Sequence, residues 1–307
     1  MDALQLSEFI KTKAREVGFT ACGISKAEAL KPEGERLDDW LNNERNADMQ
    51  FMNNHLEKRK DPRVLVEGAR SVISVLANYY PKEELSNSKY KLAKYAYGVD
   101  YHFVVKEMLK QIVLALEEEI GSFSYRVFAD SAPVMDKAWA IRSGLGFMGK
   151  NTNLIKKKAG SFFFIGEIIC DLEIKTDLPE LKTYCGNCTR CLDACPTGAL
   201  EAPYTLNANK CVSYLTIENR GEIPQHFKED LGLRMYGCDT CQDVCPHNRF
   251  SLATTIEEFH PSDELKAMTD EDWNELTRSK FKSLFRYSAV KRAGYKGLRR
   301  NIDFIKD

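Results

Sequence analysis

The sequence lacks a long hydrophobic run, since no stretch of its 307 residues approaches the roughly 18 apolar residues that a membrane-spanning helix needs. It also lacks a basic stretch followed by an apolar one near its start, MDALQLSEF, so no secretion signal is visible. The net charge is −1, which excludes a protein that coats nucleic acid along its whole surface but allows a local basic site. We therefore expect a cytoplasmic protein with no membrane partner.

Familiar nucleotide-binding patterns are also missing. The segment GLGFMG (144–149) matches G-x-G-x-x-G in form, but it follows PVMDKAWAIRS (133–143), which is predicted to be a helix rather than the required strand. The following GKN lacks the spacing of a phosphate-binding loop. These glycines are therefore predicted to end a helix and form a tight loop. No Ser-His-Asp arrangement can be argued from the sequence either.

Cysteine is abundant and clustered. Eight of the ten cysteines lie between positions 185 and 245, and a cytosolic chain seldom keeps disulfides, so the cluster indicates metal binding. The run CGNCTRCLDACP has the bacterial ferredoxin spacing C-x2-C-x2-C-x3-C-P. A second run, CDTCQDVCP, has the same ending but no leading cysteine, and Cys211 is the candidate that replaces it.

The eight cysteines then divide into two sets of four. In the ferredoxin pattern, the fourth cysteine of each run reaches the other cluster. The first [4Fe–4S] cluster is predicted to take Cys185, Cys188, Cys191 and Cys245, and the second Cys195, Cys211, Cys238 and Cys241. Structural zinc is the alternative, although a triple spacing followed by C-P is redundant for one tetrahedral ion. The two remaining cysteines, Cys22 and Cys170, are predicted to be inert core thiols.

Three regions differ in composition. Residues 1–180 combine predicted strands (20–25, 71–80, 125–129 and 161–170) with helices, including one capped by Ser7 and ended by Gly18 and another over 103–120. Residues 181–250 hold the clustered cysteines, and residues 251–307 are predicted to be helical. The alternation in the first region predicts a layered α/β or α+β domain. The last thirty residues, 278–307, carry ten Lys or Arg and two Asp, a net charge of +8.

Two positions of the first region are candidates for chemistry. His102 lies beside Asp100 and Tyr101 at a predicted helix start, where a capping or packing cluster is an equal alternative. Asp130 stands between a strand and the helix predicted to start near Pro133, and strand ends are where α/β sites gather. A simple helix cap is the alternative for Asp130.

The combined pattern resembles the epoxyqueuosine reductase family. The segments that carry the resemblance extend over nearly the full chain: EKR (57–59), YGVDYH (97–102), AD-S-AP (129–133), RSGLGFMGKN (142–151), SFFFIGEI (161–168), CGNCTRCLDACPTGAL, CVSYLTIENRGEIP and YGCDTCQDVCPHN. Many members continue into a C-terminal domain of helical repeats. The chain ends at Asp307, so the resemblance is to a short form, or to a longer member that has been trimmed.

The resemblance implies an α+β fold: a nitroreductase-like cobalamin-binding catalytic domain (1–180), a ferredoxin-like domain with two [4Fe–4S] clusters (181–250) and a short basic helical segment (251–307). No D-x-H-x-x-G motif is present, so cobalamin is implied by the resemblance alone. It assigns the proton donor to Asp130, and cofactor contacts to that residue and to a further set: Arg59, Tyr101, His102, Leu154, Gly166 and Glu167. Gly166, in an apolar strand, would let a flat ligand approach.

The implied reaction reduces epoxyqueuosine to queuosine at the wobble position of transfer RNA, an oxidoreductase activity. Its partners would be the anticodon stem-loop, gripped through segment 278–307 by phosphate contacts, and an unidentified electron donor. A solvated basic helix is the alternative for that segment. Two other functions remain open: an iron–sulfur electron carrier, or a corrinoid reductase of another epoxide or a halide.

Overall fold

The computed structural model describes residues 1–306, and its centre is a four-stranded sheet in the order β1-β2-β7-β4 with every neighbouring pair antiparallel. The strands are β1 (Ala21–Lys26), β2 (Ser71–Asn78), β7 (Phe163–Cys170) and β4 (Tyr125–Phe128). All four lie within two residues of the predicted ranges. The mixed α and β architecture that the sequence predicted is therefore confirmed.

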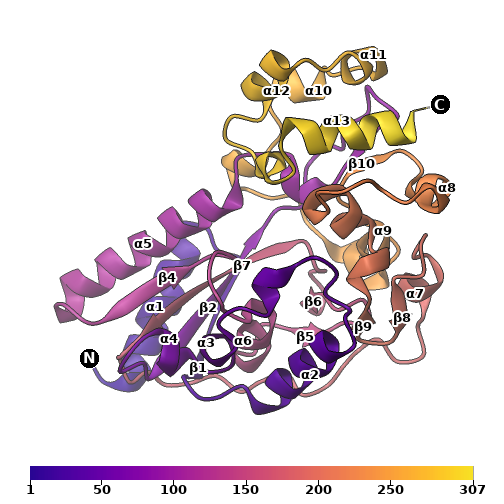
Figure 1. The fold of residues 1–307 in the computed structure, drawn as a ribbon. Coiled ribbons are helices and arrows are strands. Elements are labelled where there is room, and N and C mark those ends of the chain that lie inside the picture. The colour runs from indigo at the N-terminus through magenta and orange to yellow at the C-terminus, as the bar shows by residue number, and fades with distance from the viewer. Residues whose placement is uncertain (307) are drawn as a thin grey trace.

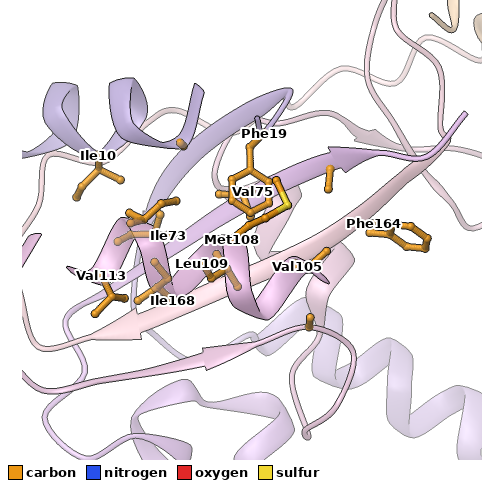
Figure 2. Packing of buried hydrophobic residues seen from close by; sticks show 14 of the residues in the cluster. Ile10, Phe19, Ile73, Val75, Val105, Met108, Leu109, Val113, Phe164 and Ile168 are labelled. Carbon is orange, nitrogen blue, oxygen red and sulfur yellow. The ribbon is translucent and has the colours of Figure 1, made fainter. Parts of the chain in front are cut away.

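Helices cover both faces of this sheet (Figure 1). Helices α1 (Ala3–Val17) and α5 (Tyr101–Ile120) pack on one face, and α6 (Asp136–Arg142) packs on the other. Successive residues of β2 alternate between the layers: Ile73 and Val75 join the α1/α5 core, whereas Val72 joins the α6 side. Figure 2 shows side chains of α5 lying over the strands in that core. Strands buried on both faces explain their nearly continuous apolar sequence.

The ends of the two long helices differ partly from prediction. Gly18 ends α1 with φ 108°, as its sequence position suggested. Asp2 caps that helix, however, and Ser7 is buried within it, so the predicted Ser7 cap is wrong. At α5 the cap is Asp100, whose carboxylate accepts a hydrogen bond from the His102 backbone N–H. This cap fixes the orientation of the residues that open α5.

The remaining elements are short. Helices α2 (Lys31–Asn42), α3 (Leu56–Lys60) and α4 (Pro62–Leu65) precede β2, and a small sheet pairs β5 (Phe147–Met148) with β6 (Leu154–Ile155). The cysteine region contains α7 (Arg190–Asp193), β8 (Leu200–Ala202), β9 (Thr205–Leu206), α8 (Lys228–Leu231), β10 (Arg234–Tyr236) and α9 (Thr240–Asp243). The C-terminal helices are α10 (Asp263–Lys266), α11 (Asp270–Asn274), α12 (Arg278–Leu284) and α13 (Gly294–Ile305). Within residues 1–306, no helix is both long and apolar enough to cross a membrane.

A second hydrophobic core joins all three predicted regions. It brings together Leu92 from the first region, Tyr236 from the cysteine region and Trp273 from the C-terminal helices. Strand β3 (Lys91–Leu92) pairs in parallel with β10, which adds backbone hydrogen bonds to the same junction. The regions that differ in composition at positions 180 and 250 therefore share one interior.

Candidate active site and metal centres

The two cysteine runs fold into matching loops that lie against each other. Helices α7 and α9 are in contact, and each carries the third cysteine position of its run, Cys191 and Cys241. The next cysteine closes the turn in both, with Cys195 N–H donating to Leu192 O and Cys245 N–H to Gln242 O. In the second loop, Met235 of β10 stands where a leading cysteine would be. The second loop therefore lacks one cysteine ligand, and Cys211, from outside the loop, is the predicted replacement.

The first predicted sulfur set surrounds one cavity. Cys185, Cys188, Cys191 and Cys245 all line it, together with Tyr184 and His247. Burial and the neighbouring Cys185 and Cys245 raise the pKa of Cys191. Sulfurs that repel one another as thiolates are stabilised by a cationic metal group, so the grouping suits metal binding.

The second predicted set is also brought together. Burial, followed by the charges of Cys238, Cys211 and Cys195, raises the pKa of Cys241. Asn153 Nδ2 lies 3.9 Å from Cys241 Sγ, and Asn151 donates to Cys241 O at 3.1 Å. Cys245 therefore lies with the cysteines of the first run and Cys195 acts on Cys241 of the second, which is the grouping that crossed ligation would need; the ligation itself stays a prediction.

The arrangement suits clusters better than single ions. In residues 1–306, no three His, Cys, Asp or Glu side chains converge on one metal-ion position. The first sulfur set instead lines a cavity of about 90 Å³, several times the roughly 15 Å³ that one water molecule needs. The zinc alternative needs a compact tetrahedral site.

Asp130 lies in a turn after β4 and does not cap a helix. Its φ is 49°, in the left-handed region that Asp and Asn tolerate better than most residues. Helix α6 starts at Asp136, with Met135 as its N-cap, so the expected start near Pro133 and the helix-cap alternative for Asp130 are both wrong. The Asp130 carboxylate instead accepts a hydrogen bond from the Tyr101 hydroxyl.

Tyr101 and His102 hold Asp130 in place from the start of α5. The Tyr101 ring stacks on Phe164 of β7, with ring centroids 4.2 Å apart, which fixes the direction of its hydroxyl. The His102 ring places Nε2 3.3 Å from the Asp130 carbonyl oxygen and Nδ1 2.7 Å from Asp100 Oδ1. Desolvation acts to lower the pKa of His102, but the hydrogen bond and charge of Asp100 outweigh it and raise that pKa. The protonated form of His102 is therefore more stable beside Asp130 than that of a free imidazole.

Two cations flank this acid. Desolvation lowers the pKa of Arg59, against the opposing charges of Asp136 and Asp130. The Arg59 Nε atom is buried and has no hydrogen-bond partner among the described residues. Lys137 is an exposed side chain, yet its pKa is lowered by desolvation, against the charges of Asp130 and Cys241. The Lys137 amine donates to Thr152 O at 3.0 Å and to Asn153 Oδ1 at 3.3 Å, and the Asn153 amide in turn lies beside Cys241 of the second sulfur set.

A pair of buried carboxyl groups lies beneath the site. Glu167 of β7 is completely buried on the α6 side of the sheet, where it meets Asp136 at the start of α6. No N–H or hydroxyl group among residues 1–306 reaches either Glu167 oxygen, and its hydrogen-bond partner is the Asp136 carboxyl. Burial and the charge of Asp136 raise the pKa of Glu167, while burial and the charge of Asp130 raise that of Asp136 to about 6. The pair therefore retains a proton to a higher pH than an exposed carboxyl group would.

Two of the predicted cofactor contacts are placed elsewhere. A side chain at Gly166 would meet Val105 Cγ1 at 2.6 Å and Leu109 Cδ1 at 3.0 Å, so this glycine allows α5 to pack closely against β7. The prediction that Gly166 leaves room for a flat ligand is therefore wrong. Leu154 of β6 is 4% exposed and packs with Leu76 and Leu145. Its side chain is thus part of the core on the α6 face.

The comparisons with known proteins agree with this geometry. Residues 184–248 match the family described as "4Fe-4S double cluster binding domain", and residues 59–131 match "Epoxyqueuosine reductase QueG, DUF1730". The chain is 52% identical to an epoxyqueuosine reductase of Cellulophaga algicola over 98% of both chains. The chain belongs to the epoxyqueuosine reductase family.

Solved structures extend the comparison. A crystal structure of an epoxyqueuosine reductase with an epoxyqueuosine-modified tRNA-Tyr stem loop matches with a TM-score of 0.90 and 29% identity, covering 98% of this chain and 80% of that one. A reductive dehalogenase associated with B12-dependent dehalogenation matches with a TM-score of 0.50 and 16% identity, covering 98% of this chain and 38% of that chain. The second likeness concerns the fold alone.

The sequence analysis did not identify two charged residues near the candidate acid of this member of the epoxyqueuosine reductase family. Asp136 and Lys137 lie in a segment that the sequence marked only as a good helix former. The Asp136 carboxyl interacts with Glu167, and the charge of Cys241 acts on the Lys137 amine. Both partners are distant in the chain, so the sequence did not reveal them. The charged pair DK at the start of an otherwise apolar helix was the available signal.

Replacing Glu167 by Gln should stabilise the protein at high pH. Because the folded pKa of Asp136 is raised to about 6, its contribution to stability is present at low pH and is lost as the pH rises through that value. A Gln amide at position 167 would still donate a hydrogen bond to Asp136, and it would remove the carboxyl group that titrates beside it. We expect an increase of about 1 kcal/mol in unfolding free energy near pH 8, shrinking toward pH 5.

Thermal unfolding under anaerobic conditions measures this difference. The matched control is Glu173→Gln, at a carboxylate whose side chain is 71% exposed and which pairs with Arg70 on the surface. It should show no such pH-dependent gain. A destabilisation by Glu167→Gln of equal size at both pH values would contradict the shared proton.

Proposed function

We propose that this chain reduces epoxyqueuosine to queuosine at the wobble position of transfer RNA, using cobalamin and electrons that pass through two [4Fe–4S] clusters. The observation that carries the proposal is the position of Lys137. Its amine donates to Asn153 Oδ1 at 3.3 Å, Asn153 Nδ2 lies 3.9 Å from Cys241 Sγ, and the charge of Asp130 acts on the same amine. Lys137 would therefore connect the proton donor with the inner end of the electron path.

The proposal assigns a part to each region of the chain. Residues 1–180 would form the cobalamin-binding catalytic domain, residues 181–250 the two-cluster domain and residues 251–307 the basic helical segment. Cys185, Cys188, Cys191 and Cys245 would hold the first cluster, and Cys195, Cys211, Cys238 and Cys241 the second. The grouping of sulfurs described above supports this division of ligands.

The polar groups around Asp130 fit a large cofactor with an amide-rich rim. Arg59 Nε is buried without a partner, and an amide carbonyl could accept its hydrogen bond. The exposed Lys137 amine can donate in the same way. When bound, cobalamin supplies a reduced metal nucleophile for attack on an epoxide carbon, while the protein supplies orientation and protons.

The protein's own part in the chemistry is proton delivery. Conversion of an epoxide to an alkene consumes two electrons and two protons and releases water. Opening the ring leaves an alkoxide, which needs an acid close by. Asp130 would donate that proton, with Tyr101 fixing the direction of its carboxyl group. His102, whose Nε2 lies 3.3 Å from the Asp130 carbonyl oxygen, would be a second proton source beside it.

The entrance to the site suits an RNA loop. The Asp100 backbone N–H donates to Tyr287 O at 2.6 Å, so Tyr287, 61% exposed, lies beside the start of α5. Arg286 and Lys291 lie over the Tyr287 ring at 5.3 and 5.9 Å from its centroid. Exposed aromatic and basic side chains together can stack a splayed base and bind its phosphates.

The predicted basic segment is only partly available for such contacts. The Arg300 guanidinium donates to the carbonyl oxygens of Leu215 and Asn219, and Arg299 pairs with Asp303. Arg292 pairs with Glu218. The contacts to RNA are therefore expected from Arg286 and Lys291 rather than from the segment as a whole.

The double variant Arg286→Glu/Lys291→Glu should bind the anticodon stem-loop about tenfold more weakly or worse at low salt. Loss of two phosphate contacts should also reduce the salt slope by about 2. Fluorescence anisotropy with a labelled stem-loop at several salt concentrations measures both. The matched control, Lys13→Glu/Lys110→Glu, reverses two charges on α1 and α5 and should leave affinity unchanged. Equal affinity of the two double variants would remove these side chains from the interface.

One experiment tests the function as a whole. The chain is purified anaerobically, analysed for iron and sulfide, titrated with cobalamin and incubated with epoxyqueuosine-containing transfer RNA and a chemical reductant. The proposal expects about eight irons per chain, corrin binding and queuosine detected by mass spectrometry of the RNA nucleosides. Clusters without corrin binding would indicate an electron carrier. Corrin binding without queuosine would indicate another substrate.

A further inference from the structure

The two sulfur sets differ in their distance from solvent. Around the first set, Gly186, Asn187, Thr189 and Arg190 are all exposed, so the loop that carries three of its cysteines forms part of the surface. Around Cys211, Cys238 and Cys241 of the second set, no residue from 211 to 216 or from 235 to 242 is exposed, whereas Cys195 lies between exposed Asp193 and Gly198. An electron arriving from outside the protein therefore meets the first set before the second.

Basic side chains surround the opening of the first set. Lys150 and Arg190 line its cavity. Lys157 Nζ lies 4.4 Å from the centroid of the Tyr184 ring, which lines the same cavity. Lys182, exposed, precedes Tyr184 by two residues, and Lys158, exposed, follows Lys157. We call these five residues the basic rim.

Acidic side chains do not cancel this charge. Glu180 accepts a hydrogen bond from the Tyr184 hydroxyl, and Asp193 accepts one from Thr189. Against these two carboxylates the basic rim has five positive charges, although the chain as a whole is at −1. Leu178 and Leu181, 88% and 87% exposed, add apolar surface on the adjacent segment. Exposed apolar groups beside a one-signed charge are typical of a transient protein-binding site.

We propose that the basic rim is the docking surface for an acidic one-electron carrier protein, which reduces the first cluster through the exposed loop 186–190. This inference rests on the proposed function, because it requires that the first sulfur set holds an iron–sulfur cluster. At each encounter the reduced carrier loses one electron and the cluster gains one. Two encounters supply the two electrons that one epoxide consumes.

Charge reversal on the rim tests the proposal. Lys150 is left intact because its amine donates to the carbonyl oxygens of Gly186 and Cys188 and so holds the cysteine loop. The variant Lys157→Glu/Lys182→Glu is compared with Lys157→Gln/Lys182→Gln, which only neutralises the two charges. Lys13→Glu/Lys110→Glu on α1 and α5 is the matched control, since Figure 1 places α5 away from α7.

Reduction of the clusters is followed by absorbance in an anaerobic stopped-flow instrument with two reductants. A reduced flavodoxin is the acidic carrier, and the methyl viologen radical cation is a small reductant that needs no docking surface. We expect the Glu variant to react with flavodoxin about tenfold more slowly or worse at low salt, with a smaller loss for the Gln variant. The difference should shrink at high salt, because the charges are screened. Viologen rates should not fall.

Several results would overturn the proposal. An unchanged flavodoxin rate would do so, and so would equal losses with both reductants, which would assign the lysines to cluster integrity. A loss of stem-loop affinity with normal flavodoxin kinetics would make the rim an RNA surface. Iron analysis of the same samples separates the two hypotheses. A chain without clusters refutes the proposed function and this inference together, whereas a chain with both clusters and unaltered kinetics refutes the docking surface alone.

Discussion

Replacing Asp130 by Asn should lower the rate of queuosine formation by about 10²- to 10⁴-fold, the range over which a positioned general acid contributes. The effect should fall on kcat, because the amide cannot deliver the proton that the opened epoxide needs. Cluster content and corrin binding should be retained. Single-turnover assays with mass spectrometry of the RNA nucleosides measure the rate.

The backbone makes this substitution a clean one. Asp130 has a φ of 49°, and Asn tolerates that region as well as Asp does. The Asn side-chain oxygen can still accept the hydrogen bond from the Tyr101 hydroxyl. Asp263→Asn is the matched control, because its side chain is fully exposed. Full activity of Asp130→Asn would transfer the acid role to another group, with His102 the nearest candidate.

Replacing Cys211 by Ala should remove one cluster and leave the other. Cys211 is brought near Cys238 and Cys195, whose charges act with burial to raise its pKa, whereas the first sulfur set lines a separate cavity. We expect the iron content to fall from about eight to about four per chain. Turnover should be lost, because the cluster held by the second sulfur set, beside Asn153 and Lys137, would be missing. Iron analysis and electron paramagnetic resonance of the reduced protein measure the change.

Cys22→Ala is the control for this experiment. Cys22 is partly buried against the α1/α5 core, and burial raises the pKa of its thiol to about 12. Its removal should leave the iron content unchanged. Eight irons in Cys211→Ala with unaltered spectra would refute ligation by Cys211 and return the choice of eighth ligand to the remaining polar groups of that loop.

The sequence predicted the strands and the two cysteine loops well because both depend on local signals. Apolar runs bounded by turn residues give the four strands, and the spacing of the cysteines gives the two loops. The place of Asp130 was predicted less well. Its turn was read as a helix start because Pro133 suits a first helical position, whereas α6 begins three residues later.

The failures have a common physical origin. Position 166 must be a glycine because Val105 and Leu109 of α5 leave no room for a side chain. The raised pKa of Glu167 depends in part on the neighbouring Asp136. In both cases the contacting residues are far apart in the chain, and they meet only because a helix packs on β7. The alternation of β7 decides which of two adjacent residues faces α5 and which faces α6. No local pattern assigns that orientation when both faces are apolar.

The shared interior of the three regions has a consequence for electron flow. Leu92, Tyr236 and Trp273 belong to one core, and Gln242 and Asn248 of the second cysteine loop donate to Ser161 just before β7, so this loop is held to the layered sheet. Tunnelling between redox centres falls steeply as their separation grows. A fused interior sets that gap once, at folding, and the enzyme needs no moving arm to bring its inner centre to the reacting bond.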